Sequence, residues 1–190
     1  MRNDCKAGMT TGAALDAGAS QKLGVTVEQL YHVECWRDGR LVWEDDFLNL
    51  VVTAGLNEYL AATLAAGTQH TTWYVALITG PGAGNTYAAT DTHASHPGFS
   101  ENTGYSDATR QAWTPGAVSG GSVDNGAARA VFHVNGTSTV AGAFMSTSNV
   151  KGSTALGPVL LGEGNFSGGD REVQAGDTLN VTVTCTMAAA

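Results

Sequence analysis

One short segment carries the residues best suited to binding a metal ion, the run D-T-H-A-S-H over 91–96. Imidazole nitrogens and carboxylate oxygens are common ligands of zinc and other transition metals. His93 and His96 are three residues apart, so a curled loop could bring both rings to one ion together with Asp91. Loop backbone does not fix that geometry, and no cysteine stands nearby to complete a strong set. The alternative is that both histidines make ordinary hydrogen bonds on a loop, and the sequence predicts no bound cofactor.

No segment carries the residues of a familiar catalytic arrangement. The chain has no G-x-S-x-G turn to expose a nucleophilic serine, and none of its three cysteines stands in a recognised catalytic context with a histidine. The acidic run 44–46 is typical of a solvated surface just ahead of a helix, rather than of a general acid–base pair. The glycine-rich run 80–85 lacks the lysine of a phosphate-binding loop. The sequence therefore predicts a protein that is not an enzyme and has no catalytic residues.

The candidate metal ligands lie in a long polar loop, residues 80–104, which must be positioned by strands on either side. Loops of this length are uncommon in compact domains and tend to be functional. Strand-forming residues precede the loop over 71–79, and Asp38-Gly39 between two β-prone runs predicts a tight hairpin over 30–45. Short strands separated by turn residues are typical of a β-sandwich or jelly roll. Further strands are expected at about 105–113, 127–134, 138–147, 155–161 and 178–187.

A single helix is expected at about 49–66. Leu56, Leu60 and Leu64 follow one another at intervals of four residues, which is the spacing of one helical stripe. Asn49 or Thr53 is a candidate N-cap, and Gly67 stands where a C-terminal glycine belongs. We expect this helix to lie on one edge or face of the sheets. The predicted fold class is mainly β, with one α-helix.

The first 28 residues contain almost no large apolar side chains, so they cannot bury enough surface to fold by themselves. The sequence predicts an extended N-terminal arm over 1–28 and a β-sandwich domain over 29–190. In this interpretation the arm is held by a neighbouring subunit or partner through Leu15, Leu23 and Val25. The alternative is that the arm folds back on its own domain.

Composition and charge exclude several classes of partner. The net charge is −8 and the chain has only nine Lys and Arg, so a basic patch for nucleic acid or an anionic membrane could hardly form. No apolar run approaches the roughly 20 residues of a transmembrane helix. Charged residues make up 14% of the chain against a usual value of about 25%. A surface with so few charges is typical of a protein that is covered in an assembly.

Several strings of residues together resemble a known pattern. They include R-D-G-R-L-V-W-E-D-D-F-L-N-L-V-V-T-A-G-L-N-E-Y-L (37–60), W-Y-V-A-L-I-T-G (73–80), A-A-T-D-T-H-A-S-H-P-G-F-S-E (88–101) and Y-S-D-A-T-R-Q-A-W (105–113). They continue with G-S-V-D-N-G-A-A-R-A-V-F (121–132), V-A-G-A-F (140–144), G-E-G-N-F (162–166) and A-G-D-T-L-N-V-T-V-T (175–184). Through these strings the chain resembles a family of small virion structural proteins of tailed bacteriophages. The resemblance covers roughly residues 32–186 and leaves out the predicted arm.

The resemblance implies a structural part of the virus particle, made in the cytoplasm of the bacterial host. The first expectation is a capsid decoration (cement) protein on the outer capsid surface, which binds the major capsid protein and forms a dimer or trimer with itself. Two alternatives stay open: a tail- or neck-associated protein, and a glycan-binding module for host attachment that uses loop Trp and Tyr. The arm and the 80–104 loop are the expected contacts, through Leu15, Leu23, Val25, Asn85, Tyr87, His96 and Phe99.

Overall fold

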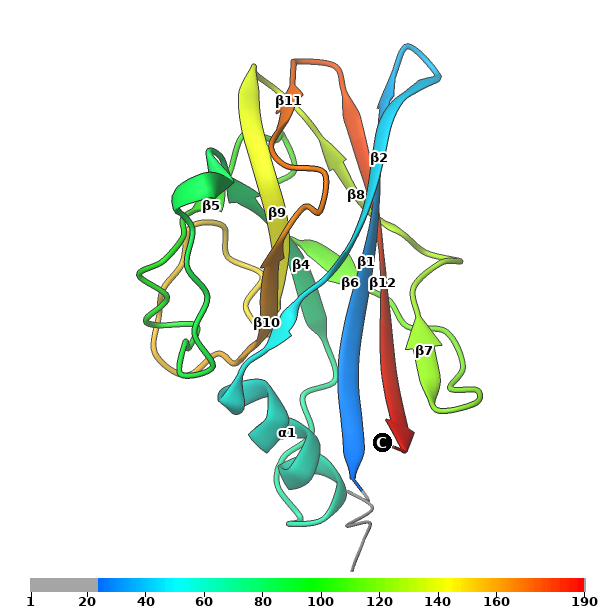
Figure 1. The fold of residues 1–190 in the computed structure, drawn as a ribbon, viewed down its shortest axis with the longest axis vertical. Coiled ribbons are helices and arrows are strands. Elements are labelled where there is room, and N and C mark those ends of the chain that lie inside the picture. Colours follow the sequence, from blue (N-terminus) through cyan, green and yellow to red (C-terminus); the bar gives the residue numbers. More distant parts are fainter. Residues whose placement is uncertain (1–23, 190) are drawn as a thin grey trace, which may run out of the picture.

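Two antiparallel β-sheets pack face to face, and one α-helix lies at one end of them (Figure 1). This is a computed structural model, and it describes residues 24–189. The mainly β sandwich predicted from the sequence is confirmed. A hydrophobic core forms between the two sheets, because alternate residues of the long strands point toward the facing sheet.

The first sheet is built on three long strands, β1 (Val25–Arg37), β2 (Arg40–Leu48) and β12 (Thr178–Ala189). Their order is β2-β1-β12, and the short strands β7 (Ser122–Asp124) and β8 (Ala130–His133) both pair with β12. The predicted hairpin between β1 and β2 is confirmed. Asp38 and Gly39 have φ values of 50° and 74°, which is the left-handed conformation that such a turn requires at both positions.

The second sheet has the order β3-β10-β9-β4-β5, with β11 pairing to β9 and β6 pairing to β4. The sequence predicted one strand over 105–113, whereas only its last three residues form β6. The bounds are β3 (Leu50–Val51), β4 (Trp73–Thr79), β5 (Glu101–Asn102), β6 (Gln111–Trp113), β9 (Ser138–Ser146), β10 (Leu160–Asn165) and β11 (Arg171–Val173).

The protein has two hydrophobic cores, one on each side of the second sheet. The larger core fills the space between the sheets and contains buried aromatic residues such as Tyr31, Phe47 and Phe132. The smaller core lies on the outer face of the second sheet, where residues of the 80–104 loop cover it. Its members are Val52, Ala76, Ile78, Phe99, Ala141, Phe144 and Leu160. In Figure 1 this loop, drawn in green, lies beside the segment that joins β9 to β10. The predicted loop is therefore a packed layer of the fold.

The helix is shorter than predicted. It spans Thr53–Thr63 as α1, because residues 50–51 pair with β10 as a strand and delay its start. Its N-cap is Val52, which makes no side-chain capping bond, so neither predicted N-cap residue has that role. At the other end Ala66, rather than Gly67, has a positive φ, 52°. Within residues 24–189 no helix is long and apolar enough to cross a bilayer.

A glycine sets how closely α1 approaches the second sheet. Gly55 is buried, and a Cβ at this position would overlap the backbone carbonyl oxygen of Leu161 in β10. The Val52 N–H donates to the same oxygen at 3.2 Å. The helix therefore packs through Gly55 and its neighbours.

We expect Gly55→Ala to lower the free energy of unfolding by about 1–3 kcal/mol, because the helix must move away from β10. The gain in helix propensity, about 1 kcal/mol, opposes this loss only in part. Gly84→Ala is the matched control, since a Cβ there meets nothing within 4 Å. Urea unfolding of the two variants measures the difference, and equal stability would contradict a close approach at Gly55.

The predicted boundary between arm and domain is wrong by a few residues. Strand β1 begins at Val25 and its pairing with β12 starts there, so 25–28 belong to the sandwich rather than to an arm. Val25 itself lies at the exposed start of the strand. Leu15 and Leu23 lie outside the described residues, as does the rest of the predicted arm up to residue 23.

Candidate functional site

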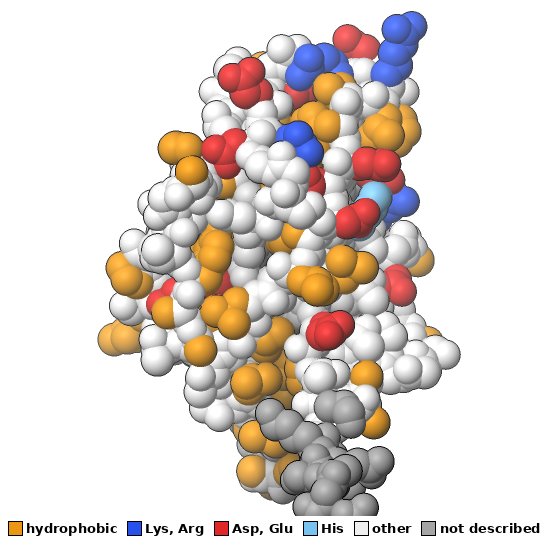
Figure 2. Space-filling model, in the orientation of Figure 1, with side chains coloured by type: hydrophobic (Ala, Val, Ile, Leu, Met, Phe, Trp, Pro, Cys, Tyr) orange, Lys and Arg blue, Asp and Glu red, His pale blue; other side chains and the backbone are white. Residues whose placement is uncertain are grey.

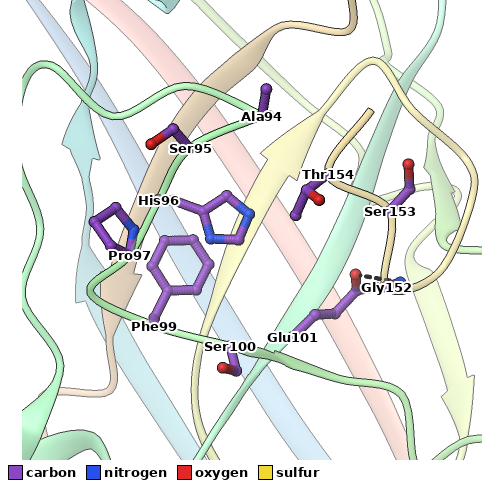
Figure 3. A pocket seen from close by; sticks show the side chains of 10 residues that line it. All are labelled: Ala94, Ser95, His96, Pro97, Phe99, Ser100, Glu101, Gly152, Ser153 and Thr154. Carbon is purple, nitrogen blue, oxygen red and sulfur yellow. Dashed lines mark hydrogen bonds between the residues drawn. The ribbon is translucent and has the colours of Figure 1, made fainter. Parts of the chain in front are cut away.

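A pocket of about 590 Å³ opens on the outer face of the second sheet. One wall is the segment 94–101 of the long loop, and the opposite wall is the turn 152–154 (Figure 3). His96 and Phe99 stack on one side, with ring centroids 4.3 Å apart and planes inclined by 19°. Hydroxyl groups complete the lining, those of Ser95, Ser100, Ser153 and Thr154. The pocket offers a flat ring stack and several hydroxyls, which suits a polar ligand.

A buried ion pair adjoins this pocket through Glu101, which is one of the lining residues. Arg110 donates to both carboxylate oxygens of Glu101, at 3.1 and 2.7 Å, and their side chains are only 1% and 5% exposed. The guanidinium also donates to the carbonyl oxygens of Ser148 and Ser153, at 3.2 and 3.1 Å. Glu101 accepts a further bond from the Gly152 N–H at 2.7 Å. The Glu101 carboxylate therefore accepts three hydrogen bonds and joins the two walls of the pocket.

Next to this ion pair a histidine and a serine contact each other in the interior. The Nδ1 atom of His93 lies 2.8 Å from the Oγ of Ser146. Burial, together with the neighbouring Arg110, lowers the pKa of His93 to about 4. A serine beside a neutral imidazole could in principle be activated as a nucleophile. Both side chains are buried, however, and neither lines the pocket, so this contact fixes the loop to β9.

Two carboxyl groups also meet beneath the long loop. Glu163 in β10 is fully buried, and within residues 24–189 neither of its oxygens accepts a hydrogen bond. Burial, together with the adjacent carboxyl group of Asp91, raises the pKa of Glu163 to about 9. Glu163 is therefore a neutral acid at pH 7, and in that form it can donate a hydrogen bond to Asp91. Asp91 accepts a second bond from the Ala88 N–H at 3.1 Å.

The three candidate metal ligands do not form one ligand set. Asp91 faces Glu163, His93 contacts Ser146, and His96 stacks on Phe99. Among residues 24–189 there is no group of three or more His, Cys, Asp or Glu side chains placed to hold a metal ion. The H-x-x-H spacing instead places one ring in the interior and the other in the pocket wall.

The predicted partner contacts of the long loop mostly bind within the chain. Asn85 and Tyr87 are half-buried and both contact the Asn165 side chain, which Asn85 reaches at 3.1 Å. Phe99 packs in the smaller core and also lines the pocket, and its role as a partner contact stays a prediction. His96 is half-buried in the pocket wall. Of the four predicted contacts, His96 and Phe99 line the pocket, whereas Asn85 and Tyr87 do not.

The aromatic residues of the glycan alternative are placed differently from the prediction. Trp73 and Trp113 are strand residues that pack against the larger core, and the Trp113 indole N–H donates to the Val183 carbonyl at 3.1 Å. Tyr87 is tilted by 48° against Phe99. Host attachment through a platform of loop aromatics stays a prediction.

The leucine stripe from which the helix was predicted is exposed in the structure, which sequence reasoning did not anticipate. Leu56, Leu60 and Leu64 are 39%, 54% and 81% exposed, although their spacing is that of a helical stripe. We call these three residues the leucine surface. Figure 2 shows hydrophobic side chains gathered at the end of the molecule that carries α1, whereas several Lys and Arg lie at the opposite end. Contiguous exposed apolar residues of this kind usually mark a protein contact.

Comparison with models of known protein families and with curated proteins finds no match for this chain. Its function is therefore inferred from the geometry above and from the resemblance of its sequence motifs.

Proposed function

We propose that this chain is a non-enzymatic structural protein of a tailed-bacteriophage particle, and that it acts as a decoration protein on the outer surface of the head. The observation that carries the proposal is the leucine surface of α1. A decoration protein is stabilised by the surface that it buries against other subunits. In this proposal the leucine surface docks on the major capsid protein.

The fold around α1 supports a docking role because it holds the helix rigidly. The close contact of Gly55 with β10 leaves the leucine surface turned outward. The Thr53 N–H donates to the Ala89 carbonyl at 2.8 Å, which ties the start of the helix to the long loop. A surface that is already ordered costs little conformational entropy when it binds.

The buried polar groups of the long loop support a structural role over a chemical one. The Glu101 carboxylate accepts hydrogen bonds from Arg110 and Gly152, and Ser146 and His93 are buried and do not line the pocket. These groups serve to bind the loop to the sheet. A rigid sandwich with an apolar helix face that residues 24–189 leave exposed is what a docking module requires.

We expect Leu60→Asp to weaken binding to purified heads that lack this protein by at least about tenfold, because a charge would be buried in an apolar contact. Leu156→Asp is the matched control, since Leu156 is 89% exposed and belongs to the segment between β9 and β10 rather than to α1. Co-sedimentation of each variant with heads, quantified against the major capsid protein, gives the affinity. Circular dichroism checks that both variants are folded.

The outcomes separate the alternatives. Saturable binding at a copy number close to that of the major capsid protein, lost in the Leu60 variant only, supports decoration through the leucine surface. Binding of a few copies to tails or necks would favour the tail-associated alternative. Loss of binding in the Leu156 variant alone would move the docking surface to the β9–β10 segment. If the leucine surface instead joins copies of this chain, light scattering would show a dimer or trimer that Leu60→Asp dissociates.

A further inference from the structure

A second pocket, of about 230 Å³, lies between α1 and the strands β4, β6, β7, β10 and β12. Four rings line it, those of Tyr59, His70, Trp73 and Trp113. Its remaining lining is largely apolar and includes Ala62, Val123, Leu161 and Cys185. The pocket is distinct from the leucine surface, because it is lined by Glu58, Tyr59, Ala62 and Thr63 of the helix rather than by the three leucines.

The rings are held in fixed positions. Trp73 and Trp113 stand opposite each other in the pairing of β4 with β6. The Trp113 indole is fixed by its bond to Val183, and His70 lies edge-on to Trp73, with ring centroids 6.0 Å apart. Because the side chains of this pocket are already ordered, binding a ligand costs little of their conformational entropy.

One carboxylate gives this aromatic pocket its charge. Glu58 lines it, and its Oε1 accepts bonds from the backbone N–H of His70 at 3.3 Å and from the His70 ring at 2.5 Å. Both bonds go to Oε1, so Oε2 is not used by His70. Among the described residues that line the pocket, none is Lys or Arg. An anion would be repelled here, whereas a cation would meet a carboxylate and aromatic rings, whose faces attract cations.

We propose that this pocket binds an organic cation, meaning an alkylated ammonium or a guanidinium group with apolar substituents. The rings contact the apolar substituents and the charged group of the ligand, and the Glu58 carboxylate supplies the opposite charge. The volume suits a group of the size of one side chain. Such a group can come from a free small molecule or from a Lys or Arg side chain of a docked protein, and the two sources share the same chemistry. This inference does not depend on the proposed docking through the leucine surface.

The test compares probes of equal shape and different charge on the full chain at about pH 8. Choline and 3,3-dimethylbutan-1-ol have nearly the same shape, but only choline carries a positive charge. Nα-acetyl-arginine amide and Nα-acetyl-lysine amide represent a partner's side chain. Titration is followed by tryptophan fluorescence and by the indole N–H resonances of Trp73 and Trp113 in ¹⁵N-labelled protein. We expect choline, or one of the two amides, to shift these resonances in a saturable way and to bind at least about fivefold more tightly than the alcohol.

Two variants locate the binding. Glu58→Gln should weaken the cation by at least about fivefold while leaving the alcohol unchanged, whereas Glu172→Gln, which alters an exposed carboxylate on β11, should change neither. Trp73→Phe keeps an aromatic ring and should weaken the cation less than Trp73→Leu. Stronger shifts with choline identify a small-molecule site, and stronger shifts with an amide identify a side-chain receptor. Equal affinity for choline and the alcohol, an unaffected Glu58 variant, or no saturable shift with any cation would overturn the proposal.

Discussion

Replacing Arg110 by methionine should destabilise the protein by about 3–5 kcal/mol, which makes it one of the most damaging single changes in the chain. Methionine keeps much of the side-chain length, so the loss comes from charge and hydrogen bonds rather than from a large cavity. The variant leaves Glu101 as a buried carboxylate without its partner. It also leaves the carbonyl oxygens of Ser148 and Ser153 without their donor.

A second variant separates the destabilisation by the unpaired charge from the destabilisation by the lost hydrogen bonds. In Arg110→Met combined with Glu101→Gln neither member of this pair is charged, so we expect the double variant to recover part of the lost stability. Arg129→Met is the matched control, because Arg129 pairs with Glu34 while its side chain is 42% exposed. A surface pair of this kind contributes about 0–1 kcal/mol. Chemical denaturation measures all three, and a loss at Arg110 no larger than at Arg129 would contradict this account.

The pocket should respond to the same change. Arg110 and Glu101 join the 94–101 segment to the turn 152–154, since Glu101 accepts from Gly152 and Arg110 donates to Ser153. Without the guanidinium, we expect amide hydrogen exchange to rise in these two segments before it rises in the β1–β2 hairpin. The hairpin lies in the other sheet and shares no hydrogen bond with Arg110.

Features determined by neighbouring residues could be predicted from the sequence. The turn at Asp38-Gly39 needs two positive φ angles, and these two residue types adopt them readily. The strand at β4 follows from a run of apolar residues. The helix at α1 follows from leucines four residues apart, but the same spacing does not say which side packs. That choice is made by Gly55 and Leu161, which are distant in sequence.

The candidate site depends on contacts between residues that are far apart in the sequence, and such contacts cannot be predicted from local sequence patterns. A polar loop is ordinarily exposed. Here the loop is a packed layer because its polar side chains find partners on other elements, as His93 does with Ser146 and Asp91 does with Glu163. Arg110 gives no local sign of burial, since arginine is mostly a surface residue. Its complete set of hydrogen bonds appears only when the chain is folded.

Glu163→Gln should stabilise the protein at alkaline pH and flatten its pH dependence. The pKa of Glu163 is about 9 in the folded protein against a usual value of 4.5. Between these two values the folded state holds a proton that the unfolded state has released. The free energy of unfolding therefore falls as pH rises from about 4.5 to 9, by up to about 1.4 kcal/mol per pH unit. Glutamine has no proton to release, so this contribution disappears in the variant.

Glutamine also preserves the one bond that the neutral acid makes. Its amide N–H₂ can donate to the Asp91 carboxylate at any pH, as the protonated Glu163 does only below its own pKa. We expect the variant to be more stable than the natural protein by a few kcal/mol at about pH 8, and nearly equal to it at about pH 4.5. Thermal unfolding across this range measures the difference, and Glu172→Gln on the exposed side of β11 should leave the profile unchanged.

The difference between the two proteins isolates Glu163 from the other groups that titrate. His93 affects the free energy of unfolding at acid pH, and in the opposite direction. Its pKa is lowered to about 4 in the folded protein, so the stability that it contributes is lost as pH falls below 6.5, the ordinary pKa of histidine. That loss is common to both proteins and cancels in the comparison. If the stability of the natural protein and of the Glu163→Gln variant changed with pH in parallel, Glu163 would be charged in the folded state. It would then need a donor that the buried outer face of β10 does not provide among residues 24–189.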